Sequence, residues 1–329
     1  MSTERCLLTG ASGFIGGHVA ERLASEGYAL RCLVRATSDV ALLEGLGAEL
    51  VLGDVTDASS LAGAVSGCEY VVHCAAFVSD WGLVRDIRRV NVEGTRLLLE
   101  AAAGASVRRF VHVSTTDVYG YPGGRGVEET CVPRGFANWY AQTKAEAEAE
   151  VRRVAGLEHV ILRPATVYGP RSVDAVGEIA TAIRGGYMLL VDRGRPTAGL
   201  CYVGNLVDAL VLAIRSERAV GEAFNVCDGV EVTWAQFTGD LAAGLGARRP
   251  WLSLPFGPAR VLGRGLELSY RTVRRLTGLR IPPLLSRQAV DVLGRDQDFS
   301  NRKAREVLGW EPRVDYAAGL DATLAWLRS

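Results

Sequence analysis

The first half of the chain alternates between short apolar segments and segments with apolar positions at helical spacing. The apolar segments are hydrophobic on both faces and cover residues 5–10, 28–34, 48–54, 70–76, 108–115 and 159–169. Helical spacing is evident at 14–26, and helix-like stretches lie near 58–66, 86–104 and 138–155. Strands that are apolar on both faces are typical of a parallel sheet covered by helices on both sides. The pattern predicts an α/β fold with a doubly wound parallel sheet, which binds its ligand at the carboxyl ends of the strands.

The second half is less regular and is interrupted by proline and glycine. Helix-like segments lie near 174–185, 204–216, 233–246, 257–278, 284–294 and 316–327, and short strands near 187–191 and 222–227. We expect residues 1–168 to form the sheet domain, with return segments near 200–227. Residues 169–329 are expected to form a smaller, mostly helical lobe that binds the substrate.

Composition excludes several classes of protein. The 37 basic and 37 acidic residues balance, which gives no support to nucleic-acid binding. Seven scattered cysteines without a C-x-x-C pair argue against a disulfide framework and for a reducing compartment. The four histidines show no metal-binding spacing, so no metal site is expected. The first residues do not resemble a signal peptide and no apolar run reaches the length of a membrane span, so we expect a cytoplasmic protein.

A glycine-rich turn connects the first predicted strand to the first predicted helix. In TGASGFIG, three glycines form the spacing G-x-x-G-x-x-G. Such glycines allow a tight turn, a close approach to a pyrophosphate and close packing of helix on sheet, while the helix N-terminus offers free N–H groups. Glycine turns are common elsewhere, but at a strand-to-helix junction this one predicts a dinucleotide site. The residues expected to contact the dinucleotide here are Gly10, Ser12, Gly13, Phe14, Ile15 and Gly16.

The end of the second predicted strand distinguishes the two nicotinamide cofactors. NAD enzymes place an acidic residue there for the ribose hydroxyls, whereas this strand ends in Arg35. A guanidinium suits a 2′-phosphate, which favours NADP; NAD is the alternative if Arg35 is only a solvated surface residue. At the end of the third strand we expect Asp54 and Val55 near the adenine, unless Asp54 is simply a turn residue.

Tyr140 and Lys144 lie four residues apart in a helix-forming stretch and therefore share one helix face. A neighbouring ammonium lowers the pKa of a phenol from its usual value near ~10 and lets it exchange a proton with an alcohol or ketone. The strand end VHVSTTDVYG supplies Ser114, Thr115 and Thr116, whose hydroxyls can bond a substrate oxygen. Only one other lysine occurs among the 37 basic residues, so Lys144 departs from a strong arginine bias. The alternative is that Tyr140 and Lys144 are an ordinary pair of surface residues without a chemical role.

Seven motifs occur along nearly the whole chain in the order found in extended short-chain dehydrogenases, the NAD-dependent epimerase/dehydratase group. They are TGASGFIG, HCAA, NVEGT, VSTTDVYG, YAQTK, LRPATVYGP and YVGNLVDA. The resemblance implies a Rossmann domain and an NAD(P)-dependent enzyme in which Tyr140 is the acid/base. Lys144 would bind the nicotinamide ribose and tune Tyr140. Thr115 would be the third catalytic group, since the family's hydroxyl lies four residues before the tyrosine of V-Y-G.

The same resemblance implies roles for residues at the other strand ends. Further cofactor contacts are implied for Cys74, Ala75, Ala76, Pro164 and Thr166, and substrate contacts for Phe77, Trp81 and Thr116. Asn91 in NVEGT is expected to tie a helix to the sheet, and Ser114 to face the cofactor or the core.

Within the group the chain resembles the 3β-hydroxysteroid dehydrogenase branch, on Trp81, NVEGT and the tail LGRDQDFSNRKAREVLGWEPRV. This implies interconversion of a secondary alcohol and a ketone on a hydrophobic substrate, steroid-like or a β-keto acid. Residues 250–285, apolar and arginine-rich, would cover an apolar pocket, rest on a membrane surface, or form an ordinary core-facing helix.

Two alternatives to this function stay open. A nucleotide-sugar epimerase or dehydratase has the same fold, but such enzymes usually carry R-D-x-x-Y-V for the substrate phosphate. The segment TAGLCYVGN lacks the charged pair, unless Arg193 or Arg195 takes its place. A nonenzymatic dinucleotide sensor would typically lack the tyrosine–lysine pair.

The resemblance also suggests a homodimer that pairs segments 86–104 and 138–155 with their copies. The contacts would come from Val90, Leu97, Leu98, Ala141, Ala145 and Ala149, unless these positions face only the sheet.

Overall fold

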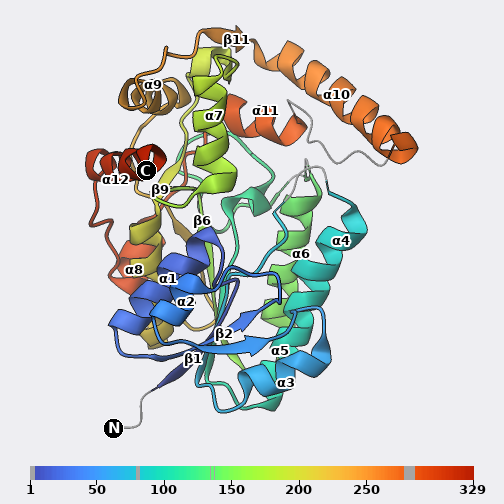
Figure 1. Ribbon diagram of the computed structural model, residues 1–329, viewed down its shortest axis with the longest axis vertical. Coiled ribbons are helices and arrows are strands. Elements are labelled where there is room, and N and C mark those ends of the chain that lie inside the picture. The colour runs from blue at the N-terminus through green and yellow to red at the C-terminus, as the bar shows by residue number, and fades with distance from the viewer. Residues whose placement is uncertain (1–3, 79–81, 134, 137, 278–285) are drawn as a thin grey trace.

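The fold is built on one sheet of seven parallel strands (Figure 1). The computed structural model describes residues 4–78, 82–133, 135–136, 138–277 and 286–329. The strands are β1 (Arg5–Thr9), β2 (Ala29–Val34), β3 (Glu49–Leu52), β4 (Tyr70–His73), β5 (Arg109–Val113), β6 (Glu158–Pro164) and β10 (Ala223–Val226). Their order, β10-β6-β5-β4-β1-β2-β3, reverses direction between β1 and β4. This confirms the predicted Rossmann-type sheet, whose ligand crevice lies at the carboxyl ends of those two strands.

Helices cover both faces of the sheet, as strands without polar alternation require. Helices α1 (Phe14–Ser25) and α8 (Val203–Arg215) lie on one face. Helices α3 (Ala58–Val65), α5 (Thr95–Gly104) and α6 (Trp139–Arg153) lie on the other. A short helix that the pattern did not predict, α2 (Ala41–Gly45), packs near α1.

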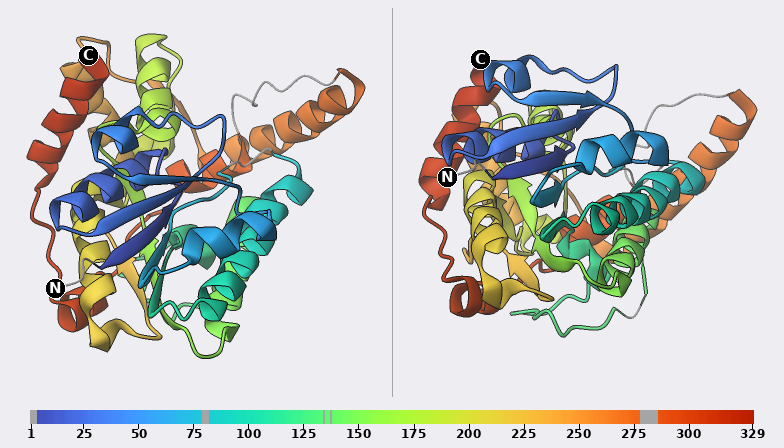
Figure 2. Two further views of the ribbon diagram at one scale, coloured as in Figure 1. Left: turned by 60° about the horizontal axis from the view of Figure 1, so that its bottom comes forward. Right: turned by 90° about the horizontal axis from the view of Figure 1, so that it is seen from below.

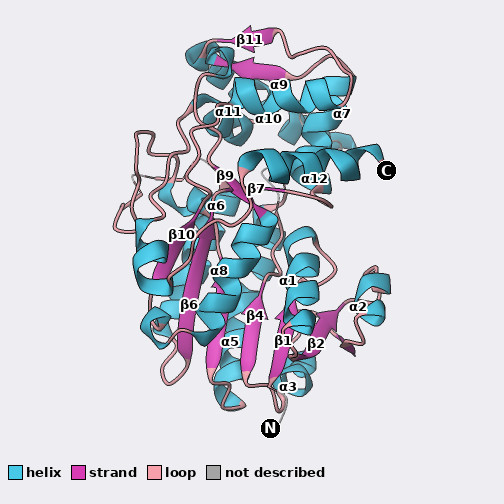
Figure 3. Cartoon of the chain, turned by 90° about the vertical axis from the view of Figure 1, so that its left-hand side faces the viewer, coloured by secondary structure: helices cyan, strands magenta, loops and turns pink. Residues whose placement is uncertain are grey.

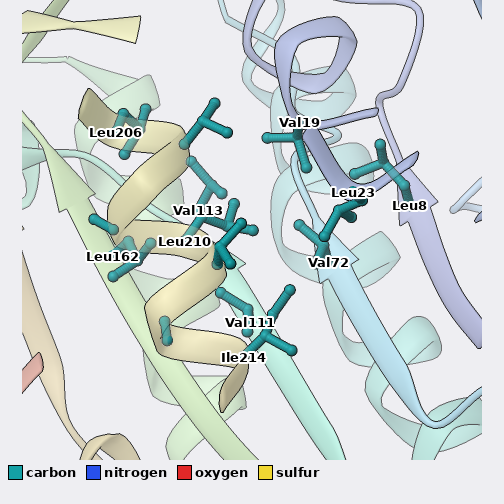
Figure 4. Packing of buried hydrophobic residues seen from close by; sticks show 14 of the residues in the cluster. Leu8, Val19, Leu23, Val72, Val111, Val113, Leu162, Leu206, Leu210 and Ile214 are labelled. Atoms are coloured by element: carbon teal, nitrogen blue, oxygen red, sulfur yellow. The ribbon is translucent and has the colours of Figure 1, made fainter. Parts of the chain in front are cut away.

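The centre of the core between the sheet and its first helical layer is built from aliphatic side chains (Figure 4). Leu8, Val72, Val111 and Leu162 project from four adjacent strands and are fully buried. The side chains that cover them from α1 and α8 are Val19, Leu23, Leu206, Leu210 and Ile214. Each such side chain stabilises the fold by about 1.5–3 kcal/mol on leaving water. This layer fixes the strand ends that carry the site.

The segment 159–169, predicted as one strand, is two. After Pro164, which has no N–H to donate to the ladder, the chain leaves the large sheet and the Thr166 N–H donates to the carbonyl of Gly199 (2.8 Å). Residues Thr166–Tyr168 form β7, which pairs with β9 (Leu200–Tyr202). A further small sheet joins β8 (Leu189–Val191) to β11 (Leu252–Leu254). The prediction missed β9 and β11 because three residues are too short for a periodic signal.

The remaining helices gather beyond the carboxyl ends of the large sheet, at the end opposite to the N-terminus (Figure 3). They are α7 (Glu178–Arg184), α9 (Trp234–Gly244), α10 (Phe256–Thr277), α11 (Arg287–Gly294) and α12 (Tyr316–Arg328). Trp234, Phe237 and Leu241 centre a second core there. The predicted domain boundary after residue 168 falls at the end of β7, and α8 and β10 later return to the large sheet.

Helix α10 projects away from this lobe in both views of Figure 2. None of the helices in the described part of the chain is long and apolar enough to cross a membrane.

Candidate active site

The glycine turn is shaped by close backbone contacts. Gly10 has a φ of 72°, and a Cβ atom there would lie 2.7 Å from the backbone nitrogen of Ala75. A Cβ atom on Gly16 would lie 2.0 Å from the carbonyl oxygen of Gly10. Gly13, exposed, is the N-cap of α1, and no described side chain caps this helix end. The free N–H groups at an open helix N-terminus suit a pyrophosphate, so the turn fits a dinucleotide.

The other predicted residues of the turn and the residues after β4 lie around it. Ser12 is exposed, while Phe14 and Ile15 are partly exposed on the first turn of α1. Cys74, Ala75 and Ala76 are partly exposed and follow β4 directly beside Gly10. The two strand ends are also joined by a hydrogen bond from the Ala75 N–H to Thr9 Oγ1 (3.3 Å). The structure therefore brings these two predicted segments together.

The residues predicted to contact the adenosine half lie at the ends of β2 and β3. Arg35 is exposed and forms no ion pair with any described residue. Asp54 Oδ1 accepts hydrogen bonds from the N–H and hydroxyl of Thr56 (2.8 Å each), which is the turn role that the sequence left open. Val55 is buried, and a Cβ atom on Gly94 would lie 2.9 Å from it. Contacts of Arg35, Asp54 and Val55 with a cofactor stay predictions.

The three predicted catalytic residues lie on two elements that pack together. Thr115 is the N-cap of the 3₁₀ turn η2 (Thr116–Tyr119), and its Oγ1 accepts from the Asp117 N–H (3.2 Å). Helix α6 packs against this turn and carries Tyr140 and Lys144 in its first two turns. Asn138 begins α6, because its Oδ1 accepts from the Ala141 N–H (2.7 Å).

Lys144 is not a surface residue, since only 2% of it is exposed. Its Nζ donates to the Val113 carbonyl (2.7 Å) and lies 3.3 Å from His112 Nε2. Burial lowers the pKa of Lys144 to about 8. Burial, followed by the Lys144 charge, holds the pKa of His112 well below its usual range, so that this ring is neutral. The alternative of a surface pair is therefore wrong for Lys144.

A second histidine supports the first. The His73 and His112 rings lie 5.4 Å apart, and the His73 nitrogens bond the hydroxyls of Thr9 (2.7 Å) and Thr95 (2.9 Å). Burial lowers the pKa of His73 to about 3. Both rings are thus neutral: His112 lies against the Lys144 ammonium, and His73 packs against His112.

Tyr140 differs from the expectation. Burial raises its pKa above the usual value, and the negative charge of Asp117 raises it further. The expected lowering by Lys144 is not seen, because its ammonium is directed at Val113 and His112. The phenol is therefore protonated at neutral pH.

Asn91 clamps the segment after β4. The helix that carries it changes from α4 (Val84–Arg88) to a π turn (Arg89–Gly94) before α5 begins. Asn91 Oδ1 accepts from the Phe77 N–H (2.7 Å), and its Nδ2 donates to the Phe77 carbonyl (3.2 Å) and to Thr143 Oγ1 (3.1 Å). Asn91 thus ties its helix to the segment after β4 and to α6, whereas the sequence predicted a tie between a helix and the sheet.

The remaining predicted residues differ in exposure. Phe77 is 37% exposed and Thr166 is partly exposed, whereas Thr116 and Pro164 are buried. Trp81 lies outside the described residues. Ser114 faces the core: its hydroxyl donates to Glu148 Oε1 (2.7 Å).

Sequence reasoning missed Asp117 and Tyr121, which interact electrostatically with Tyr140, and Gln288, whose Nε2 donates to Asp117 Oδ2. Asp117 stands next to the three hydroxyl residues of the strand end, which was a usable signal. Tyr121 and Gln288 carried none, because backbone geometry and a distant helix bring them to the site. Among the described residues, no group of three or more histidine, cysteine, aspartate or glutamate side chains is arranged to hold a metal ion.

Comparisons with known proteins agree with this geometry. Residues 6–227 match the model of the NAD dependent epimerase/dehydratase family. A ketoreductase of a farnesylated dihydroquinoline oxide from Stigmatella aurantiaca is 32% identical, over 97% of this chain and 95% of that protein. Sterol demethylase protein B of Methylococcus capsulatus is 32% identical over 98% of both chains. A 3 beta-hydroxysteroid dehydrogenase/Delta 5-->4-isomerase of Mycobacterium tuberculosis is 31% identical, over 95% of this chain and 88% of that protein.

Solved structures share the whole fold. The crystal structure of gox2253 has a TM-score of 0.82 at 28% identity and covers 99% of this chain and 98% of its own. DesIV, a dTDP-glucose 4,6-dehydratase from Streptomyces venezuelae solved with NAD and TYD, has a TM-score of 0.79 at 26% identity, covering 98% of this chain and 97% of its own. With the family model matched over two thirds of its length, this chain belongs to the NAD dependent epimerase/dehydratase family, the extended short-chain dehydrogenases, and is an enzyme of that kind.

Proposed function

We propose that this enzyme interconverts a secondary alcohol and a ketone on a hydrophobic substrate. The observation that carries the proposal is the packing of η2, capped by Thr115, against the helix that carries Tyr140 and the buried Lys144. These residues and the glycine turn lie at one edge of the sheet, where α/β enzymes bind ligands. Relatives named as a ketoreductase and as a 3 beta-hydroxysteroid dehydrogenase support an apolar ketone.

The proposed roles follow from the chemistry of each side chain. When bound, a nicotinamide dinucleotide supplies the hydride for reduction and accepts it in oxidation. In reduction, the Tyr140 hydroxyl gives its proton to the carbonyl oxygen, so that C=O becomes CH–OH and Tyr140 is left as phenolate. The Thr115 hydroxyl donates a hydrogen bond to the same oxygen. Lys144, whose ammonium faces Val113 and His112 rather than the phenol, would bind the nicotinamide ribose. Because the pKa of Tyr140 is raised by burial and by Asp117, the phenol carries at neutral pH the proton that reduction requires.

The test is a set of apolar ketones and secondary alcohols assayed by nicotinamide absorbance with both cofactors. We expect turnover of ketones with the reduced cofactor, faster with NADPH than with NADH. No turnover of any ketone or alcohol by the folded protein would contradict the proposal.

The preference for NADP rests on Arg35. Its guanidinium is exposed at the end of β2 with no described ion-pair partner, so it is available to a 2′-phosphate. NAD is the alternative cofactor, since the solved neighbours include a structure with NAD bound.

A nucleotide-sugar substrate is the second candidate, because DesIV shares the fold at 26% identity. Against it stands the segment Gly199–Tyr202, which offers no charged pair for a substrate phosphate. An epimerase or dehydratase regenerates its cofactor within each turnover and retains it. Stoichiometric cofactor in the purified protein, with conversion of UDP-glucose or dTDP-glucose, would favour this candidate.

We also propose a homodimer in a reducing compartment such as the cytoplasm. All seven cysteines lie in the described part of the chain and none forms a disulfide, which fits a reducing environment. Leu98 and Ala141 are fully buried against their own chain and cannot form the dimer contact. The partly exposed Val90, Leu97, Ala145 and Ala149 are left for it. Light scattering near 35.2 kDa rather than twice that mass would refute the dimer.

Peripheral membrane contact is a further proposal, carried by exposed apolar side chains at α10. On α10, Val261 is 75% exposed and lies next to the exposed Arg260 in the sequence; Trp251, which precedes β11, is 77% exposed and lies near Arg248 and Arg249. Apolar side chains flanked by cations suit an anionic membrane surface. Co-sedimentation with anionic but not neutral vesicles is the expected result.

A further inference from the structure

Four polar side chains beside Tyr140 form a cluster whose hydrogen bonding is incomplete. We call Asp117, Tyr121, Asn138 and Gln288 the open polar cluster. Within the described part of the chain, three buried atoms of the cluster form no hydrogen bond of good geometry, namely Tyr121 Oη, Asn138 Nδ2 and Gln288 Oε1, and we call them unpaired. Tyr121 still interacts with the Asp117 carboxyl group and the Asn138 amide, which places the three side chains together. Buried polar atoms are almost always paired, so three unpaired atoms in one place point to a polar group that the protein alone does not supply.

Tyr121 is held in the cluster by an unusual backbone. Its φ is 56°, which bulky residues rarely adopt outside functional sites, and only 4% of it is exposed. The preceding Gly120 also has a positive φ of 69°, and a Cβ atom there would lie 2.1 Å from the Gly135 carbonyl oxygen. The turn after η2 therefore directs a tyrosine ring into the interior.

The cluster adjoins the proton-donating hydroxyl. The Asp117 carboxyl group interacts electrostatically with both Tyr140 and Tyr121, and Asn138 precedes Tyr140 by two residues on α6. Gln288 reaches in from α11 of the lobe, and its Nε2 donates to Asp117 Oδ2 (3.3 Å). Both halves of the molecule thus contribute to one polar patch at the reacting end of the site.

We propose that the open polar cluster binds a neutral hydroxyl on the carbon next to the reacting carbonyl, so that the substrate is a hydrophobic α-hydroxy ketone. The inference rests on the proposed ketone reduction and names its substrate class. Asp117 and Gln288 Oε1 accept hydrogen bonds, while Asn138 Nδ2 donates and Tyr121 Oη does either. A hydroxyl both donates and accepts, and it meets this set of partners. A carboxylate only accepts and is repelled by Asp117, so the cluster selects against a β-keto acid.

The experiment compares three ketones of one carbon skeleton. They are butyroin (an eight-carbon α-hydroxy ketone), the eight-carbon ketone without the hydroxyl, and the β-keto carboxylate with a carboxylate in its place. The wild-type kcat/KM for butyroin should exceed that for each of the others by roughly 10- to 100-fold, since a site built to bond a hydroxyl rejects the analogue that lacks it. The ratio cancels any general loss of activity.

Variants test whether the cluster causes the preference. Tyr121→Phe and Asp117→Asn should each bring the ratio of butyroin to plain ketone within about threefold of unity. Tyr119→Phe is the matched control: that hydroxyl is bonded to Asn225 and Arg163, outside the cluster, so the ratio should persist. Gln288→Leu serves if either cluster variant fails to fold. A wild-type ratio near unity, or a ratio that survives loss of the Tyr121 hydroxyl, overturns the inference, and the unpaired atoms then bind water only.

A binding measurement separates this inference from the proposed reaction. The Tyr140→Phe variant, loaded with NADPH, should bind butyroin more tightly than the plain ketone by calorimetry. If butyroin binds more tightly than the plain ketone but the wild type turns over neither, the result contradicts the proposed reduction and supports hydroxyl binding by the open polar cluster. Turnover of all three ketones without preference would support the reaction and overturn the cluster.

Discussion

Two buried polar groupings lie within a few residues of each other at the end of β5, and they differ in one respect. In the first, which we call the ion-pair network, Arg163 donates to both oxygens of Glu148 (2.9 and 2.7 Å), and Ser114 donates to one of them. Arg163 also donates to Tyr119 Oη, which in turn donates to Asn225 (2.6 Å). None of its described side chains is among the unpaired buried atoms. The open polar cluster, whose Asp117 and Tyr121 flank Tyr119 in the sequence, has three unpaired atoms among the described residues.

The difference indicates that the ion-pair network has a structural role, whereas the open polar cluster still has hydrogen-bonding capacity for a ligand. A fully bonded polar group joins β5, β6, α6 and β10 and offers nothing to a ligand. An incompletely bonded group of similar residues carries the energetic cost of its unpaired atoms, and unpaired atoms of this kind are expected at functional sites. Residue type alone does not distinguish Tyr119 from Tyr121, since only their partners differ.

The pKa values of the two buried carboxyl groups, Glu148 and Asp117, shift in opposite directions. Burial works to raise the pKa of Glu148, but hydrogen bonds from Arg163 and its charge hold that pKa below the usual value. Burial raises the pKa of Asp117 to about 6, and no described cation opposes it.

The largest expected effect is on the ion-pair network. Arg163→Met leaves Glu148 buried with only Ser114 and the half-exposed Arg152 as partners. Breaking a buried pair from one side costs about 3–5 kcal/mol, so denaturant unfolding should show a loss of this size. The double variant Arg163→Met with Glu148→Leu should recover part of it, because no charge is left unpaired. A single variant as stable as the wild type would contradict the distinction between the two groupings.

The second effect concerns turnover. Tyr140→Phe removes only the proton donor, so cofactor binding should persist while kcat falls by at least ~100-fold. Lys144→Arg should also impair activity, because a planar guanidinium does not fit the ammonium's site between Val113 and His112. Trp139→Phe, on the exposed side of the same helix turn, is the control. Near-normal kcat in the Tyr140 variant would remove it from the mechanism.

The third effect concerns cofactor preference and depends on Arg35, which faces solvent, whereas Arg163 is bonded within the ion-pair network. Arg35→Asp should shift the ratio of kcat/KM values from NADP towards NAD by roughly 10- to 100-fold, equivalent to about 1.5–3 kcal/mol for a charge-assisted bond. Folding stability should be unchanged, since Arg35 has no described ion-pair partner. A wild-type enzyme that already prefers NAD would show that Arg35 does not read the cofactor.

The smallest effect is a dependence of stability on pH. The folded pKa of Asp117, about 6, lies above its ordinary value, so its contribution is fully present below pH ~4 and is lost as the pH rises through 6. The substitution Asp117→Asn should therefore raise the free energy of unfolding, relative to the wild type, by about 1 kcal/mol more at pH 8 than at pH 5 for this partly exposed side chain. The Glu148 contribution has the opposite sign and weakens as the pH falls. Thermal unfolding of the wild type and the variant at pH 5 and pH 8 measures this difference. An equal change in stability at the two pH values would contradict the prediction.

Much of the fold and half of the site were predictable because they depend on local or periodic signals. Apolar runs identified the strands of the large sheet, and the glycine spacing identified a turn whose close contacts leave no room for a Cβ atom at Gly10 or Gly16. The spacing of Tyr140 and Lys144 identified one helix face. These features are properties of a few consecutive residues, and the chain has little choice in how it meets them.

The tertiary structure decided what each polar side chain contacts. It buried Lys144 against Val113 and His112, assigned Ser114 to Glu148, and raised the pKa of Tyr140 where the helix face alone predicted a fall. It also brought Gln288 from α11 to Asp117, across 171 positions of sequence. Burial and long-range partners determine the protonation of a side chain, and neither is encoded in its immediate neighbours. The sequence by itself determined the glycine turn and the helix face that Tyr140 and Lys144 share, because both are local. Only the folded chain determined which polar atoms near Tyr140 remain unpaired, because their partners come from distant segments.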